Sequence, residues 1–375
     1  MNIALLNTRL LIFTVTSCMV LSGFAVGLDR ETIKQKISTT KLWLETQQQA
    51  SGAWLPAEQP AITAIVLGAI EDSRSKRKED ELCGKGYAFL LNNLHPDGGI
   101  YGGTNYQNYN TSWSLIAFAK SGRSEFRPII QKARPLIVSW QMDLGEKGRV
   151  DSPFDGGIGY GDGTPRANLP NTLVPLEALY LTRSLAKKGE PQLNQEMLRE
   201  FLHRCQHLPA VNHETWVLQD QENGDGFIYN PGRSMAGEIK LPDGKVSYRA
   251  YGSMTYAGLL ASYYAGVKKD DPAVTSGFKW IGRHFTVDEN PGLGQDGLFH
   301  YYHLMAETFS IYKVKKIKLA SGKEVDWREV LGAKLLSLQR PDGSWINPND
   351  RWMEGNPVLC TAYALSALNA IAKGH

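Results

Sequence analysis

Two kinds of hydrophobic pattern alternate along the chain. Residues 361–368 read Thr-Ala-Tyr-Ala-Leu-Ser-Ala-Leu and carry no charge on any face, so they predict a helix that is buried all round. In the preceding segment, apolar residues such as Ala333 and Leu336 follow helical spacing among polar ones. A water-facing helix followed by a buried helix predicts helical pairs arranged in two layers.

The pair of helices recurs six times, and a glycine-containing polar turn joins its two members. Aspartate precedes the glycine in every turn except the first, where Ser51 takes its place. The aspartate side chain accepts hydrogen bonds from local backbone N–H groups, and the glycine adopts the positive φ that reverses the chain. Glutamines near the ends of the first helices can bond orphan helix carbonyls: Gln47, Gln141, Gln206 and Gln339. The turn glycines are Gly52, Gly98, Gly156, Gly226, Gly297 and Gly343.

Tandem helical pairs form either an open superhelical solenoid or a closed ring. Six pairs without a polar capping repeat favour closure, in which outer helices face water and inner helices line the middle. We therefore predict an all-α fold, an (α/α)6 toroid of six helical hairpins closed into a double ring, over residues 28–375. Longer insertions around the third to fifth pairs should crowd the rim of its cavity.

Residues 1–27 form a separate segment. A polar start bearing Arg9 precedes an apolar run that ends near the small residues Ala25 and Gly27, which predicts a signal peptide and an exported, periplasmic or secreted protein. A lipoprotein anchored at Cys18 is the less favoured alternative, because the residues after Cys18 stay apolar. A retained anchor is another alternative, since the run is of marginal length for a membrane span.

Composition and charge are those of a globular protein that does not bind nucleic acid. The 375 residues are 42% hydrophobic and 21% charged, and the formal net charge is only +3. Three cysteines follow the predicted signal peptide, without a C-x-x-C pair, so at least one thiol stays unpaired: Cys83, Cys205 and Cys360. No Gly-rich phosphate loop, G-x-S-x-G elbow or H-E-x-x-H occurs, and we expect no cofactor.

The last repeat carries a resemblance to a known family. Residues 335–345, Leu-Leu-Ser-Leu-Gln-Arg-Pro-Asp-Gly-Ser-Trp, resemble the glutamine-to-tryptophan repeat of squalene and hopene cyclases. The six units together are similar to the prenyltransferase and squalene oxidase repeat over residues 36–371. The resemblance, to the terpenoid cyclase and protein prenyltransferase superfamily, implies a toroid that holds a small apolar, isoprenoid-like ligand at the end where the inner helices begin.

Superposing the starts of the six inner helices predicts one layer of the cavity: Ile62, Asn110, Asn171, Ser253, His303 and Cys360. In the class II cyclases that the chain resembles, a D-x-D-D acid occupies this layer, and such an acid has to be kept neutral in a pocket of low polarity. No D-x-D-D occurs here, so catalysis is unproven. Glu307, one turn beyond His303, is the inner-helix acid nearest the layer apart from Glu177, and a general acid would be Glu307 with His303.

The zinc site of the protein prenyltransferases is only partly matched. Those enzymes hold zinc with an aspartate, a cysteine and a histidine, and the matching positions here carry Tyr301, His303 and Cys360. The carboxylate is lost and the order of the other ligands is exchanged. We therefore expect no metal, and a polar helix end with a buried thiol in its place.

Other candidate ligand-binding residues are aromatic or basic. Aromatics over a cavity can stabilise carbocations, stack on sugars or simply pack, and a loop arginine can hold an acidic group. A lysine run from Lys313 to Lys318 predicts a solvated outer face, with peripheral membrane contact as its alternative. The remaining candidates are Trp113, Tyr251, Tyr301, Tyr302, Arg351 and Trp352.

Three functions fit these observations. The chain is an enzyme of terpenoid cyclase (isomerase or lyase) or transferase type, an exported binding protein that does no chemistry, or a polysaccharide-active (α/α)6 enzyme. A deep, dry, aromatic pocket would support the first, and a broad groove lined with acids the third. The sequence leaves the oligomeric state open.

Overall fold

The computed structural model describes residues 29–55, 59–73, 81–161, 163–164 and 166–373. The predicted signal peptide and Cys18 lie outside these residues. Helices dominate the described part, which confirms the all-α prediction. Three short 3-10 turns, at Ser124–Phe126, Arg183–Leu185 and Arg351–Met353, accompany the α-helices.

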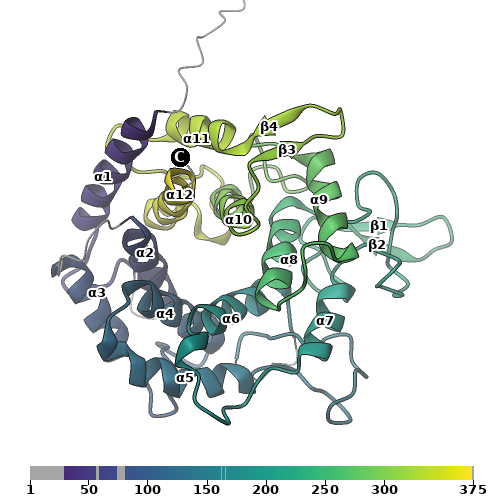
Figure 1. The fold of residues 1–375 in the computed structure, drawn as a ribbon, viewed down its shortest axis with the longest axis horizontal. Helices are drawn as coiled ribbons and strands as arrows, with labels where there is room; N and C mark the ends of the chain where they lie inside the picture. The colour runs from purple at the N-terminus through teal and green to yellow at the C-terminus, as the bar shows by residue number, and fades with distance from the viewer. Residues whose placement is uncertain (1–28, 56–58, 74–80, 162, 165, 374–375) are drawn as a thin grey trace, which may run out of the picture.

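The α-helices form two layers (Figure 1). The outer helices are α1 (Arg30–Thr46), α3 (Glu81–Asn92), α5 (Arg127–Ser139), α7 (Gln195–Arg204), α9 (Pro272–His284) and α11 (Trp327–Leu338). The inner helices are α2 (Pro60–Asp72), α4 (Gln107–Ser121), α6 (Leu169–Leu181), α8 (Gly252–Tyr264), α10 (Leu298–Ile311) and α12 (Pro357–Ala372). Each inner helix contacts the next along the chain, and α12 contacts both α2 and α1.

Two antiparallel hairpins lie outside the helical layers. Strands β1 (Glu238–Lys240) and β2 (Val246–Tyr248) pair within the long connection between α7 and α8, and β3 (Lys316–Lys318) pairs with β4 (Glu324–Asp326) before α11. Lys316 and Lys318 are exposed, as expected of a solvated face. None of the described helices is both long enough and apolar enough to cross a membrane.

The burial of each layer follows from its sequence. In α8 every residue from Gly252 to Ser262 is buried, because the helix has no charged face to turn toward water. In α7 only one stripe is buried, formed by residues such as Leu198 and Phe201. Polar caps and prolines set where the inner helices begin: Asn168 accepts a 3.0 Å bond from the backbone N–H of Asn171, and Pro357 opens α12.

In every pair but the fifth, a threonine ties the turn to the inner helix that follows it. The hydroxyl of Thr172 accepts a 2.9 Å bond from the buried backbone N–H of Ile158, and Thr361 does the same for Trp345 at 3.0 Å. The bond recurs at Thr63, Thr111 and Thr255. The fifth pair differs, because there the backbone N–H groups at the start of α10 donate to Glu354 instead.

Glutamine side chains join four of the six turns to a neighbouring outer helix, from Gln48, Gln141, Gln206 and Gln339. Gln141 donates to the carbonyls of Gly156 and Asn194, both at 3.0 Å, and Gln206 bonds Asp225 and Ala273 in the same way. In the first pair this residue is Gln48, one position after the expected Gln47. The glutamines therefore link successive pairs as well as satisfying a helix end.

The first and last pairs meet through buried polar contacts. The hydroxyl of Thr40 donates a 3.1 Å bond to the carbonyl of Gly343, whose φ of +91° places it in the left-handed region. The side chain of Asn369 on α12 donates a 2.8 Å bond to the carbonyl of Ala69 on α2. These contacts join the two ends of the repeat series.

Candidate functional site

A cavity of about 410 Å³ lies between the inner helices. Each inner helix contributes a residue near its start, and four of these belong to the layer expected from the sequence. In the last two pairs, His300 and Leu359 take these positions in place of His303 and Cys360. The first-turn lining residues are Ile62, Asn110, Asn171, Ser253, His300 and Leu359.

The mouth of the cavity lies at the starts of the inner helices and has an exposed apolar rim. Tyr106, Trp352 and Met353 line it and are exposed, and all three hold a positive φ that non-glycine residues rarely adopt. The ring of Trp352 lies against Gly297. On its other side the guanidinium of Arg351 stacks 4.6 Å from its centroid and pairs with Asp296 at 2.8 Å.

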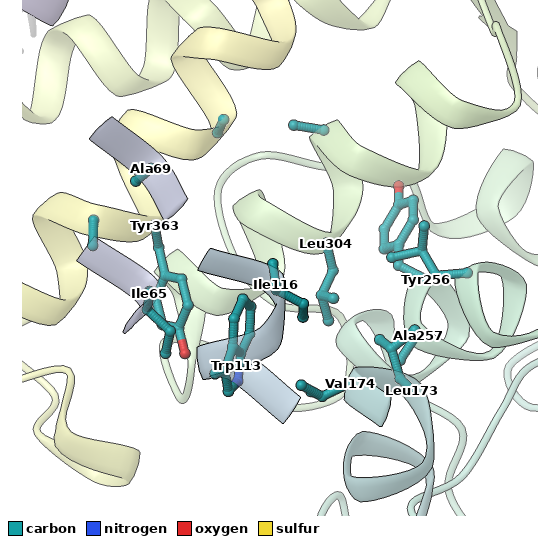
Figure 2. Close-up of a cluster of buried hydrophobic side chains, with 14 of the residues drawn as sticks. Ile65, Ala69, Trp113, Ile116, Leu173, Val174, Tyr256, Ala257, Leu304 and Tyr363 are labelled. Carbon is teal, nitrogen blue, oxygen red and sulfur yellow. The ribbon is translucent and has the colours of Figure 1, made fainter. Parts of the chain in front are cut away.

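The wall between the mouth and the inner end is apolar. Trp113 of α4 lies beside Val174 of α6, with Tyr363 of α12 and Leu304 of α10 to either side (Figure 2). Leu173, Met254 and Ala257 complete this part of the wall. Such a surface excludes water and suits a hydrocarbon chain.

His303 lies in this wall as a neutral side chain. Burial, followed by the charge of Lys120, lowers its pKa to about 3. Its ring stacks on Tyr363 with centroids 5.4 Å apart and is tilted toward Trp113 at 6.3 Å. Its Nε2 lies 3.5 Å from Oε2 of Glu307, but a neutral imidazole cannot form an ion pair there at neutral pH.

Two carboxyl groups lie at the inner end of the cavity, two helical turns beyond the mouth. Glu307 is held by Tyr264 of α8, whose hydroxyl donates a 2.6 Å bond to Oε1. Burial raises the pKa of Glu307, and both Lys120 and the Tyr264 hydroxyl oppose that rise.

Glu177 of α6 is the other carboxyl group. Glu177 is only 6% exposed, and its side chain makes no hydrogen bond or ion pair within the described part of the chain. Burial, followed by the charge of Glu307, raises its pKa well above the ordinary value. Because Glu307 has a hydrogen-bond donor and Glu177 has none, the geometry favours a proton on Glu177 and a charge on Glu307.

A chain of charges continues from these acids to the opposite face. Lys120 of α4 pairs with Asp72 of α2 at 2.7 Å, and Asp72 also pairs with the exposed Lys373 at 3.1 Å. Burial lowers the pKa of Lys120, but the carboxylates of Asp72, Glu177 and Glu307 outweigh it and raise that pKa overall. Lys120 therefore stays cationic and covers the inner end of the cavity.

Two lining amides have a hydrogen-bonding atom to spare. Asn110 accepts a 3.0 Å bond from the backbone N–H of Ala61, which leaves its Nδ2 without a partner among the described residues. Asn171 donates a 2.9 Å bond to Asn168, which leaves its Oδ1 similarly unpaired. Both atoms are shielded from solvent near the mouth, so the amides place unpaired polar groups just behind the cavity wall.

Besides Ile62 and His303, seven residues expected from the sequence line the cavity, and four do not. Tyr301 and Tyr302 point outward, where their hydroxyls donate to the carbonyls of Thr286 and Val287 at 2.7 and 2.6 Å. The thiol of Cys360 is fully buried and donates to the carbonyl of Glu354, and Arg351 stacks behind Trp352. Those that line it are Asn110, Trp113, Asn171, Tyr251, Ser253, Glu307 and Trp352.

The described residues contain no group of three or more His, Cys, Asp and Glu side chains that could hold a metal ion. Cys83, Cys205 and Cys360 are buried, and none of them forms a disulfide among the described residues. Glu354, though it lines the cavity, is saturated by the backbone N–H groups of Phe299 and His300 and by Asn347. Its role is to cap α10.

Sequence reasoning did not assign Glu177 or Lys120 to the site. Glu177 is the only charged residue in α6, and a single acid in an otherwise buried helix is the signal that marks it. Lys120 lies in the last turn of α4, where a lysine usually faces solvent. Only its contact with Asp72 of another helix identifies it.

No protein-family model matches the sequence, and no curated protein does. Solved structures do: the type II terpene cyclase MstE from Scytonema, in its apo form, gives a TM-score of 0.55 at 15% identity and covers 92% of this chain and 100% of its own. A variant of MstE in complex with its product merosterolic acid A gives 0.54 at 14% identity, over 92% and 99%. A protein from Actinoplanes gives 0.52 at 15% identity, over 92% and 100%. The chain therefore has a terpene cyclase-like fold.

Proposed function

We propose that this protein is an exported (α/α)6 toroid of six squalene cyclase-like and prenyltransferase-like repeats that binds an apolar, isoprenoid-like molecule in its central cavity. The toroid is supported by the cycle of contacts from α2 to α12 and back to α2. The observation that carries the ligand class is the apolar wall formed by Trp113, Val174, Leu304 and Tyr363. MstE variants bound to a geranylgeranyl dihydroxybenzoate substrate and to a product offer a parallel in the same fold.

A cavity-filling variant tests the ligand site. Ala257 lines the cavity, so in Ala257→Phe the added ring enters empty space and should weaken binding of geranylgeraniol at least tenfold while leaving stability nearly unchanged. Ala261, one turn later on α8, is buried but does not line the cavity. Ala261→Phe should overpack the core and lower stability by about 1–3 kcal/mol. Equal binding to wild type and Ala257→Phe would exclude this cavity as the site.

Mass spectrometry of the protein purified from its own host tests the ligand directly. A co-purified isoprenoid lipid supports the proposal, whereas a bound oligosaccharide would favour a polysaccharide-active enzyme. Sequencing the mature N-terminus tests export: a start near residue 26 or 28 supports a cleaved signal peptide, and a lipidated Cys18 supports an anchored protein.

Proton-initiated chemistry on the bound ligand is a second candidate function. The observation that favours it is the burial of Glu177 beside Glu307, because a carboxylic acid kept neutral in a pocket of low polarity can protonate an alkene. The acid would transfer its proton to an alkene carbon and become a carboxylate. That carboxylate would take a proton back when the final carbocation loses one. Cyclised products from a linear polyene, absent in Glu177→Gln and Glu307→Gln, would support this activity. If the wild-type protein leaves the linear polyene unchanged, the result would favour a binding protein without catalytic activity.

A further inference from the structure

The cavity has two polar ends of different character. At the mouth, beside the exposed rim, Asn110 and Asn171 each hold a buried amide atom without a partner among the described residues. At the inner end, Glu177 lies six residues beyond Asn171 on the same helix, about 9 Å deeper at the α-helical rise. There Lys120 and Asp72 lie between the cavity and the opposite face.

The surroundings of Glu177 favour its neutral form and leave it without a protein partner. Residues one turn earlier, Leu173 and Val174, are apolar, and Ala257 and Leu304 also line the cavity around them (Figure 2). Glu307 faces it from α10 and Lys120 from α4, but Tyr264 bonds Glu307 and Asp72 bonds Lys120. The carboxyl group of Glu177 lines the cavity without a protein partner, so a ligand atom or a water has to complete its hydrogen bonding.

We propose that Glu177 is a binding residue at the inner end of the cavity, where its carboxylic acid donates a hydrogen bond to a neutral oxygen at the end of an otherwise apolar ligand. This inference rests on the proposed function and narrows its ligand class. An alcohol, carbonyl or epoxide oxygen accepts such a bond. A terminal carboxylate is disfavoured there, because it would face Glu307 in a dry environment.

The test is a competition between three probes of similar chain: farnesol, the hydrocarbon farnesene and farnesoic acid. Native mass spectrometry of an equimolar mixture gives the ratio of bound farnesol to bound farnesene. In Glu177→Met, which keeps the volume and loses the donor, this ratio should fall about three- to tenfold, the range for one neutral hydrogen bond. Glu177→Gln keeps a neutral donor, its amide, and should retain the ratio of the wild type.

The pH dependence of binding gives a second readout, should the methionine variant fail to fold, with farnesyl methyl ether in place of farnesol because its oxygen only accepts hydrogen bonds. Ionisation of Glu177 removes its donor, so the ratio of bound ether to bound farnesene in the wild type should fall as the pH rises. The other facing groups are Glu307, Tyr264, Lys120, Asp72 and His303, and all of them remain in Glu177→Gln. The ratio of that variant should stay constant over the same range.

The outcomes separate the inference from the proposed function. If no probe binds, the proposed function fails. If the probes bind but Glu177→Met leaves the ratio unchanged, only the inference fails. Farnesoic acid that binds more tightly than farnesol, with no response to substitution of Glu177, would place the polar end of the ligand at the mouth and overturn the inference.

Discussion

The hydroxyl of Tyr264 donates a 2.6 Å hydrogen bond to Oε1 of Glu307, across from α8 to α10. This bond distinguishes Glu307 from Glu177, which lies at the same end of the cavity without a donor. Burial raises the pKa of both acids, but the phenol favours the charged form of Glu307 alone. Its contribution can be tested at Tyr264.

Removing that phenol should change both stability and protonation. In Tyr264→Phe, Glu307 loses its donor, so its pKa should rise further and the free energy of unfolding at neutral pH should fall by about 1–3 kcal/mol. Infrared spectroscopy of the protonated carboxyl band, assigned with Glu307→Gln, follows the first effect, and urea denaturation follows the second. The adjacent Tyr263 is a matched control, because its hydroxyl makes only a 3.4 Å contact with Tyr180. A loss in Tyr263→Phe as large as that in Tyr264→Phe would contradict the assignment.

Glu177 should make stability fall with rising pH. In the unfolded chain its carboxyl group ionises near 4.5, whereas burial, followed by the charge of Glu307, raises its pKa in the folded protein. The folded state binds more protons between those two pKa values, so the free energy of unfolding decreases from pH 4.5 up to the folded pKa and is flat above it. Relative to the wild type, Glu177→Gln should become more stable over that window, as measured by urea denaturation at a series of pH values. Glu238→Gln, at an exposed strand position, should show no such trend.

Each threonine that accepts a hydrogen bond from a turn should contribute separately to the stability of the protein. Thr172→Val keeps the shape but leaves the buried backbone N–H of Ile158 without its acceptor, which should cost about 1–3 kcal/mol in the free energy of unfolding. Thr361→Val should cost a similar amount at Trp345. Thr275 on α9 is exposed, and Thr275→Val should change stability by less than about 0.5 kcal/mol. Thermal denaturation of the three variants provides the comparison.

Trp352 should contribute to ligand binding from its place at the rim. Trp352→Ala removes an aromatic face that lines the mouth, and we expect geranylgeraniol to bind about five- to twentyfold more weakly, as for loss of one aromatic contact. Arg351→Ala leaves the ring in place but removes its stacking partner and the pair with Asp296. Because the Arg351–Asp296 pair is partly exposed, Arg351→Ala should weaken ligand binding less than threefold. Calorimetric titration measures both, and an Arg351→Ala effect larger than that of Trp352→Ala would assign the contact to the arginine.

The sequence by itself predicted the helices, the alternation of exposed and buried ones and the kind of residue at each turn, because these depend on local periodicity and on backbone preferences of residues such as Gly343 and Asp342. It also located the start of most inner helices, and therefore Asn110, Asn171 and Ser253. It did not determine how far each helix is rotated: Tyr301 and Tyr302 lie on α10 beside His300 and His303 yet point away from the cavity.

Only the tertiary structure decided which buried charges meet. Asp72, Lys120, Glu177 and Glu307 lie on four different helices, and the pKa of each acid depends on neighbours far away in sequence. A helical pattern shows that a residue is buried, but the free energy of its charge depends on distances across the ring. That dependence is why Glu177 could be located from the sequence while its protonation and its lack of a partner could not.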